Sequence, residues 1–265
     1  MFPSFEIFGK VIGTYSLSAI IGLAICAALA TVLGKKYGFK FEDIILFLLS
    51  VGAGMLVGGH ILYGIVNTPL LIRVLSLLPE RGIGATLQSL TVVFGGSVFY
   101  GGLFGSIIAI KIHIKFSKLK NKHQMMNIYA TMIPLFHVFG RIGCFLGGCC
   151  YGIESSFGFT THGNTYVPDI NGVSRFPVSL LEATLNLIVF FVILYMFRKF
   201  SEKYSLIHLY LFLYSMVRFS TEFLRGDEIR GIWGPFSTSQ WISLALFIYT
   251  VTRFIIKKSA QKKLN

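Results

Sequence analysis

The sequence predicts an all-α integral membrane protein with seven transmembrane helices and a small extracytoplasmic head between the fourth and fifth spans. Of its 265 residues, 54% are hydrophobic and 13% are charged, whereas roughly a quarter of the residues in a soluble domain are charged. Apolar runs of roughly 20 residues recur along the chain, and each is long enough to cross a hydrocarbon core of about 30 Å. Basic residues gather after alternate runs, which is typical of the cytoplasmic side of membrane proteins.

The apolar runs place the seven predicted spans at residues 14–33, 43–66, 96–113, 125–146, 178–197, 206–224 and 238–256. The stretch IGATLQSLTVVFGGSVFYGG, which begins at Ile83, is too polar and too interrupted by glycine for a clean helix. We expect part of it to be re-entrant or to line a cavity, because irregular backbone at membrane depth needs protein or water around it. Residues 150–177 contain many turn-forming residues and are expected to form the head. No second independent domain is expected, so residues 1–265 are predicted to form a single polytopic membrane domain.

The formal net charge of +13 reports topology rather than nucleic-acid binding, because the basic residues are sorted by side. Sixteen of the 24 lysines and arginines follow the first, third, fifth and seventh spans, and six fall on the opposite side. By the positive-inside rule, the N-terminus is predicted outside the cell and the C-terminus in the cytoplasm. We therefore expect a lipid bilayer as the surroundings and no nucleic-acid partner.

Two predicted spans carry ionisable side chains, which are costly inside a membrane and indicate a function. Each set shares one helical face: His137, Arg141 and Cys144 in the fourth span, and Tyr214, Arg218, Glu222 and Arg225 in the sixth. Arg218 and Glu222 can pair, which is expected to leave Arg141 and Arg225 as surplus positive charge. The ion pairs could simply hold a bundle together. A surplus of guanidinium groups suits an anionic ligand better, and in a membrane the available anion is a phospholipid phosphate.

The segment FYGGLFG, from Phe99 to Gly105, adds two adjacent glycines in the third span. Gly101 and Gly102 would let the backbone approach a ligand closely. The alternative is close packing between helices, because small residues at a spacing of four are common at helix contacts in membranes.

Motifs along most of the chain resemble those of one enzyme family. GRIGCFLGGCCYG, from Gly140 to Gly152, is similar to the signature G-R-x-G-x-F-x-x-G-x-x-[WY]-G, and FYGGLFG is similar to an HGGLIG element. RFPVSLLEA resembles H-P-[ST]-x-L-Y-E, while RFSTEFLR and TSQWIS resemble R-F-x-x-E-F-x-R and G-Q-x-x-S. Tyr15 matches a family tyrosine near the start of the first span. In these motifs the chain resembles the prolipoprotein diacylglyceryl transferase family.

This resemblance implies an enzyme of the bacterial cytoplasmic membrane that takes a diacylglyceryl group from phosphatidylglycerol. The acceptor would be the lipobox cysteine thiol of a secreted prolipoprotein, glycerol phosphate would leave, and no cofactor is implied. One alternative is a paralogue that uses the same donor for another extracytoplasmic acceptor, such as a polysaccharide or a different thiol. Another is a non-enzymatic lipid-binding membrane protein.

The resemblance also implies roles for individual residues. Arg141, Tyr100 and Arg225 are predicted to be catalytic, with Arg141 holding the phosphate that leaves. The predicted substrate-binding residues are Tyr15, Gly101, Gly102, Gly140, Gly143, Tyr214, Arg218, Glu222 and Gln240.

The three thiols of the signature depart from the family, which usually has Asn at Cys144 and an acidic residue at Cys149. The C-x4-C-C spacing of Cys144, Cys149 and Cys150 lacks the paired C-x2-C of structural zinc, so no metal is expected. A disulfide from Cys144 to either of the other two is one interpretation. A nucleophilic thiol with His137 as its base is another. We expect the cysteines to brace the turn after Arg141, by packing or by a disulfide, and not to act as the nucleophile.

Overall fold

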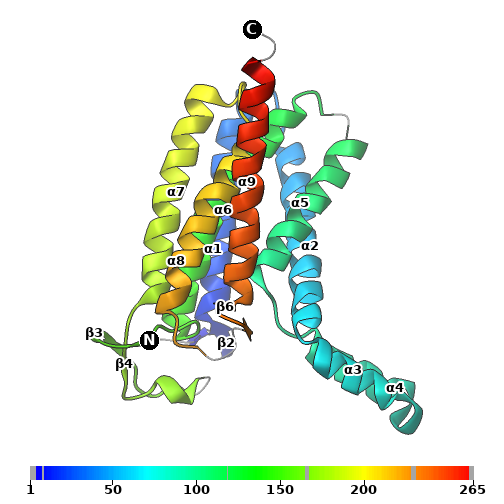
Figure 1. Cartoon of the computed structure of the whole chain (residues 1–265), viewed down its shortest axis with the longest axis vertical. Helices are drawn as coiled ribbons and strands as arrows, with labels where there is room; N and C mark the ends of the chain where they lie inside the picture. Colours follow the sequence, from blue (N-terminus) through cyan, green and yellow to red (C-terminus); the bar gives the residue numbers. More distant parts are fainter. Residues whose placement is uncertain (1–3, 8, 118, 165–166, 228–230, 263–265) are drawn as a thin grey trace. The chain divides into compact units, whose positions relative to one another are not determined.

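The computed structural model describes residues 4–7, 9–117, 119–164, 167–227 and 231–262, and its contacts divide the chain into two compact units. One unit contains residues 1–38 and 123–265, and the other contains residues 39–122 (Figure 1). Lys118, Arg230 and Lys263 of the predicted charge pattern lie outside the described residues. We describe each unit by itself.

The first unit is a bundle of five long helices that run side by side in Figure 1: α1 (Thr14–Lys35), α6 (Lys122–Gly147), α7 (Val178–Phe200), α8 (Leu206–Thr221) and α9 (Thr238–Lys262). Close contact between α1 and α6 depends on Gly22, where an added Cβ would lie 2.6 Å from Cβ of Phe139. Ser18 of α1 also donates to the backbone oxygen of Phe139 at 2.6 Å. The site-bearing helix α6 is therefore held tightly along α1.

One end of this bundle is fixed by the buried side chain of Asn127 on α6. Its Nδ2 donates to the backbone oxygens of Ser201 at 2.7 Å and Tyr204 at 3.0 Å. Its Oδ1 accepts from the backbone nitrogen of Leu206 at 2.9 Å. One amide thus satisfies the turn between α7 and α8 and sets both helices against α6.

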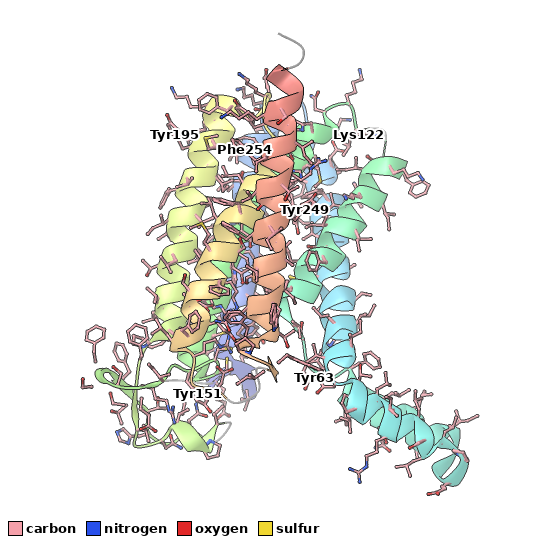
Figure 2. The ribbon with its side chains drawn as sticks, in the orientation of Figure 1. Tyr63, Lys122, Tyr151, Tyr195, Tyr249 and Phe254 are labelled. Atoms are coloured by element: carbon pink, nitrogen blue, oxygen red, sulfur yellow. The ribbon has the colours of Figure 1, made fainter. Side chains whose placement is uncertain are left out.

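The opposite end, which we call the strand end, carries the short strands that the structure describes in this unit. Two strand pairs, β1 (Ser4–Ile7) with β2 (Lys10–Gly13) and β5 (Ile232–Trp233) with β6 (Phe236–Ser237), precede α1 and α9. Between α6 and α7 lie β3 (Glu154–Thr160), the 3₁₀ turn η1 (Pro168–Ile170) and β4 (Ser174–Arg175), with β3 antiparallel to β4. The 3₁₀ turn η2 (Glu222–Leu224) continues α8. Figure 2 shows Tyr151 at this end, with Tyr195 and Phe254 toward the other.

The second unit pairs two long helices, α2 (Phe41–Val66) and α5 (Phe99–Phe116). Two shorter helices, α3 (Thr68–Ser76) and α4 (Leu78–Val93), lie between them in the sequence. Glycines line the contact between α2 and α5. An added Cβ at Gly105 would lie 2.1 Å from the oxygen of Gly54, and one at Gly101 would lie 2.4 Å from the oxygen of Gly58. This is the close backbone approach that small residues allow between membrane helices.

The expectation that residues 83–102 do not form a clean helix is wrong for its first half. Helix α4 runs to Val93, and the break falls earlier, at Gly82, whose φ is 75°. Irregular backbone occupies only residues 94–98, where Nδ1 of His60 lies 2.7 Å from the oxygen of Phe94 and 2.8 Å from that of Gly96. The helical span that follows begins at Phe99 rather than at residue 96.

Six helices among the described residues are long and apolar enough to cross a membrane: α1, α2, α5, α6, α7 and residues Thr238–Ser259 of α9. The prediction of an all-α integral membrane protein is confirmed at this level. Helix α8, the expected sixth span, has 16 residues. Its three-residue continuation η2 brings it to the predicted end at residue 224.

Candidate active site at the strand end of the helix bundle

Glu182 of α7 is the centre of a buried ionic cluster at the strand end. Its Oε1 lies 2.6 Å from Nη1 of Arg218 on α8, and its Oε2 lies 2.5 Å from Nε of Arg141 on α6. Thr221 adds a hydrogen bond of 3.0 Å to Oε1. Because Glu182 is only 2% exposed, this carboxylate depends on its two arginines, and both arginines depend on it.

Both terminal nitrogens of Arg218 have protein partners. Besides Glu182, it contacts Glu222, whose Oε2 lies 2.5 Å from Nη2, so the predicted pair of Arg218 and Glu222 is confirmed. The same Nη2 donates to Oγ of Ser239 at 3.3 Å. Arg218 therefore joins α7, α8 and α9 rather than presenting its guanidinium to a ligand.

Arg141 is held differently, by one edge. Its Nε lies against Glu182 and also donates to Nε2 of His137 at 3.2 Å. Across the described residues, no hydrogen bond of its Nη1 or Nη2 is present, so the two-pronged end of this guanidinium is available to a ligand. Beside it, an added Cβ at Gly140 would meet no atom within 4 Å. Gly143 is tightly packed instead, because its added Cβ would lie 3.1 Å from Cα of Tyr15.

Arg225 is placed by backbone pairing between two distant loops. It forms an antiparallel bridge with Gly152, supported by the bond from the nitrogen of Gly226 to the oxygen of Tyr151 at 3.0 Å. Glycine is needed in this bridge, since a Cβ at Gly152 would lie 2.2 Å from the oxygen of Phe176. The Arg225 side chain pairs with Asp227, with Nε donating to Oδ1 at 2.8 Å.

The expected surplus of positive charge is wrong for the described residues of this end. Arg141 and Arg225 were expected to lack carboxylate partners. Glu182 and Asp227 supply those partners from elsewhere in the chain. The cluster thus contains three guanidinium groups, those of Arg141, Arg218 and Arg225, and three carboxylates, those of Glu182, Glu222 and Asp227.

The cysteines gather in the turn that ends α6. Gly148 has a φ of 75°, its nitrogen bonds to the oxygen of Phe145 at 3.3 Å, and the nitrogen of Cys149 bonds to the oxygen of Cys144 at 3.1 Å. These two bonds form a Schellman motif, in which a left-handed glycine reverses the chain over the last helical turn. Cys150 follows with a φ of 54°, an uncommon value for a residue other than glycine. The sulfur atoms of Cys144, Cys149 and Cys150 all lie within 4.8 Å of one another, and all are free thiols.

The pKa values of the two thiols after the helix end, Cys149 and Cys150, are shifted in opposite directions. Hydrogen bonds from the thiols of Cys144 and Cys149 hold the pKa of Cys150 well below its usual value. The positive charges of Arg141 and Arg225 act in the same direction, while burial opposes them. The hydrogen bond with Cys144 lowers the pKa of Cys149, but its bond with Cys150 and its burial outweigh this and raise that pKa to about 12. One thiolate, on Cys150, is therefore favoured within the group.

Comparison with known proteins identifies the family. The family model described as prolipoprotein diacylglyceryl transferase matches residues 4–256. The chain belongs to the prolipoprotein diacylglyceryl transferase family. It is 33% identical over 266 residues to phosphatidylglycerol–prolipoprotein diacylglyceryl transferase 2 of Clostridium perfringens, covering 97% of this chain and 96% of the relative. It is 30% identical over 258 residues to the phosphatidylglycerol–prolipoprotein diacylglyceryl transferase of Clostridium tetani, covering 94% and 97% respectively.

The transferase-family residues predicted on α6 and α8 are brought together in the first unit. His137 lies beside Arg141, and its ring centroid is 5.1 Å from that of Tyr214. Tyr15 lies against Gly143 at the start of α1. The predicted face of α8, with Tyr214 and Arg218, is therefore the face that meets α6 and α7.

Gln240, predicted to bind substrate, has a local structural role. Its Oε1 accepts from the nitrogen of Ser237 at 3.0 Å, and its own nitrogen donates to Oγ of Ser237 at 3.2 Å. This reciprocal pair is a capping box at the start of α9. The motif S-x-x-Q in the sequence was the available signal.

Three of the predicted site residues, Tyr100, Gly101 and Gly102, lie in the second unit, and their roles in the site stay predictions. Tyr100 is 2% exposed, and its ring stacks on Phe104 with centroids 6.3 Å apart. Gly101 packs against Gly58, and an added Cβ at Gly102 would lie 2.9 Å from Cγ of Met55. These contacts support the helix-packing alternative for the two glycines.

Glu182 and Asp227 are the site residues that sequence reasoning missed. Glu182 lies within the predicted span 178–197 and within the motif RFPVSLLEA, so an acidic residue in an apolar run was a visible signal. Asp227 lies two residues after Arg225, just beyond the predicted sixth span. In this transferase-family chain both carboxylates determine which arginine remains open to a ligand.

Proposed function

We propose that this chain transfers the diacylglyceryl group of phosphatidylglycerol to the lipobox cysteine thiol of a prolipoprotein and releases glycerol phosphate. The observation that carries the proposal is the state of Arg141. Its Nε edge is fixed by Glu182 and His137, while Nη1 and Nη2 have no hydrogen-bond or ion-pair partner among the described residues. A guanidinium with two parallel N–H groups available matches two oxygens of a phosphate.

The reaction asks for negative charge to be stabilised on a leaving phosphate. The acceptor thiolate attacks the glycerol carbon that carries the phosphate, a C–S bond forms, the C–O bond breaks, and the electron pair leaves with glycerol phosphate. Arg141 is the residue proposed to hold that phosphate, because a preorganised cation stabilises charge as it develops. Glu182 orients Arg141, and Arg218 and Thr221 hold Glu182 in turn.

The other predicted residues have supporting roles in the same reaction. Arg225 supports the phosphate from the loop beside Gly152. Gly140 precedes Arg141 at a place where an added Cβ would meet no atom within 4 Å, and Tyr15 packs against Gly143; both are retained as substrate-binding residues through the family resemblance. Tyr100 is retained as a catalytic residue through the family resemblance. A tyrosine hydroxyl suits a hydrogen-bond donor better than a base, because free tyrosine has a pKa of about 10.

The topology is part of the proposal. We infer seven spans, with α8 and η2 together as the sixth, and place residues 150–177 as a small head outside the cytoplasm. Support comes from the basic residues at the end of the five-helix bundle opposite the strand end, among them Lys35, Lys199 and Lys257. By the positive-inside rule this end is cytoplasmic and the N-terminus is outside. The site then faces the compartment that secreted prolipoproteins enter.

The test uses the full chain in detergent with phosphatidylglycerol labelled in its glycerol head group. The second substrate is a lipobox peptide, with a version carrying serine in place of the acceptor cysteine as control. The expected products are labelled glycerol phosphate and a thioether-linked peptide, with none from the serine peptide. Arg141→Ala should lower the rate about 10²–10³-fold, and Arg198→Ala, at the other end of α7, should not. Release of head group without peptide product would indicate a different acceptor, and no release would overturn the transferase.

A further inference from the structure

The three thiols of the α6 turn form a site whose chemistry the proposed transfer has not used. The sulfur atoms of Cys144, Cys149 and Cys150 lie within 4.8 Å of one another. In a tetrahedral zinc site with Zn–S bonds of about 2.3 Å, neighbouring sulfurs are about 3.8 Å apart. The three thiols therefore need to close by at most about 1 Å to share one cation.

The Schellman motif explains why C-x4-C spacing suffices here. In this motif the third residue from the helix end and the second residue beyond it come into contact. Those positions are Cys144 and Cys149, and the bond of 3.1 Å between their backbone groups fixes the pairing. Cys150, in its left-handed conformation with a φ of 54°, brings the third sulfur to the same place. Two residues close in space replace the C-x2-C pair that the sequence lacks.

The surroundings suit a cation bound by thiolates. Three thiolates around a divalent cation carry a net charge of one negative unit. Arg141 precedes Cys144 by three residues on α6, and Arg225 forms a backbone bridge with Gly152, two residues after Cys150, so two guanidinium groups lie near this negative charge. Thiolates are the soft ligands that select zinc over magnesium or calcium.

We propose that Cys144, Cys149 and Cys150 bind a zinc ion whose open fourth position takes the thiolate of the acceptor. The binding of zinc stands by itself, whereas the role in acceptor binding rests on the proposed function. Three protein ligands and one exchangeable position distinguish a zinc that acts on a substrate from a structural zinc with four protein ligands.

The step balances without a redox partner. The acceptor thiol binds the zinc and loses its proton to water, because a thiol bound to zinc is deprotonated outright. The zinc-bound sulfur then attacks the glycerol carbon. The C–S bond forms, the C–O bond to phosphate breaks, glycerol phosphate leaves, and the thioether dissociates from a zinc ion of unchanged charge. This gives the acceptor a route to its thiolate that needs no strongly basic side chain.

A free thiol with a pKa of about 8.5 is about 3% thiolate at pH 7, so zinc can raise the reactive fraction up to about 30-fold. The pH dependence carries the same information. With zinc bound, the transfer rate should be nearly flat between about pH 7 and pH 8.5. Without zinc, the rate should rise about tenfold per pH unit toward the pKa of the free thiol.

The first experiment measures metal directly in the purified full chain. The protein is incubated with zinc and exchanged into metal-free buffer, and its zinc content is then measured. Cobalt(II) is substituted for zinc in a second sample, where a sulfur-to-metal charge-transfer band reports thiolate ligands. The expected result is one zinc per chain and a thiolate–cobalt spectrum in the wild type. Both should be lost in the variant with Cys144→Ser, Cys149→Ser and Cys150→Ser. Cys26→Ser, a matched change in a buried cysteine of α1, should retain both.

A second variant guards against loss of the fold. Cys144→Asn with Cys149→Glu installs the residues that the family signature usually carries, and it should fold while losing cobalt binding. Equal zinc and cobalt signals in the wild type and in both cysteine variants would overturn the site.

The last arm separates this inference from the proposed function. A lipobox peptide should shift the cobalt spectrum, and its serine version should not. A thiolate–cobalt spectrum unchanged by the peptide, together with normal peptide lipidation, would overturn acceptor binding while the transferase stands. Bound zinc without any peptide lipidation would leave the metal site in place and overturn the proposed transfer to prolipoprotein.

Discussion

Oε2 of Glu182 lies 2.5 Å from Nε of Arg141, so a carboxylate from α7 holds the arginine of α6 by one edge. The same carboxylate binds Arg218 at 2.6 Å through its other oxygen. This arrangement sorts the arginines of the cluster. Protein groups bind both terminal nitrogens of Arg218, whereas Arg141 keeps the end of its guanidinium for a ligand.

Glu182→Ala is expected to lower both stability and activity, because it leaves two buried arginines without their shared counter-charge. Removal of one partner from a buried ion pair costs about 3–5 kcal/mol. The unfolding midpoint in mixed detergent micelles measures the first effect, and turnover with phosphatidylglycerol measures the second. Glu202→Ala, an exposed acidic residue at the other end of the bundle, is the matched control. A Glu182→Ala protein as stable as that control would contradict the central role of this carboxylate.

Gly140→Ala and Gly152→Ala are expected to fail in different ways. A Cβ at Gly152 would lie 2.2 Å from the oxygen of Phe176, and such overpacking costs about 1–3 kcal/mol. A Cβ at Gly140 meets no atom within 4 Å, so its unfolding midpoint should be unchanged or higher. The methyl group would instead occupy space beside Arg141 and raise KM for phosphatidylglycerol. Equal unfolding midpoints for the two variants would count against the close packing of Gly152.

Ser237→Ala and Gln240→Ala test whether Gln240 contacts substrate. Each substitution removes one half of the capping box and should cost about 1 kcal/mol. If the cap is the whole role of Gln240, the two variants should lose stability and activity in parallel. Activity is compared at a temperature where both remain folded. A selective loss of turnover in Gln240→Ala would restore the predicted substrate-binding role.

Cys150 is expected to be the most reactive thiol of the turn near neutral pH once any metal is removed with a chelator. Its folded pKa lies below the ordinary value, whereas burial and a bond to Cys150 raise the pKa of Cys149 to about 12. Iodoacetamide labelling between pH 6 and pH 9, read by mass spectrometry of peptides, measures the order. Labelling of Cys149 before Cys150 would contradict the assignment.

The same pKa shift predicts a pH-dependent stability. Because the folded pKa of Cys150 is lower than the unfolded one, its thiolate stabilises the fold fully above about pH 8.5. That contribution is lost as the pH falls through the folded pKa. In the metal-free protein below about pH 8.5, the pH profile of the unfolding midpoint should therefore flatten in Cys150→Ser, while Cys26→Ser should retain the wild-type profile.

Local features of the site could be predicted from the sequence, and contacts between helices could not. The pair of Arg218 and Glu222 follows from a spacing of four on one helix. The partner of Arg141 lies on α7, and no spacing rule joins a residue of α6 to one of the next helix. An arginine without a partner in its own helix therefore looks like surplus charge in the sequence. The clue to its partner is Glu182, an acidic residue in an apolar run.

The segments outside the long helices show the same division. Hydropathy located the apolar helices, because length and composition decide which segments can span a bilayer. The number of glycines wrongly predicted an irregular backbone at residues 83–93, which are helical after a single break at Gly82. Gly148 was the overlooked signal in the α6 turn. A glycine just past a helix end predicts a Schellman motif, and that motif alone would have placed Cys144 beside Cys149.

The pairing of Glu182 with Arg141 affects membrane insertion, because the two residues are synthesised at different times. The ribosome completes α6 before α7, so a chain that has inserted only as far as α6 carries Arg141 without its carboxylate. An unpaired arginine in a membrane helix is costly, and this cost disappears only when α7 arrives. Helices α6 and α7 should therefore enter the bilayer as a hairpin. A protein shortened after α6 should be retained at the insertion machinery or degraded, even though α6 is long and apolar enough to cross alone.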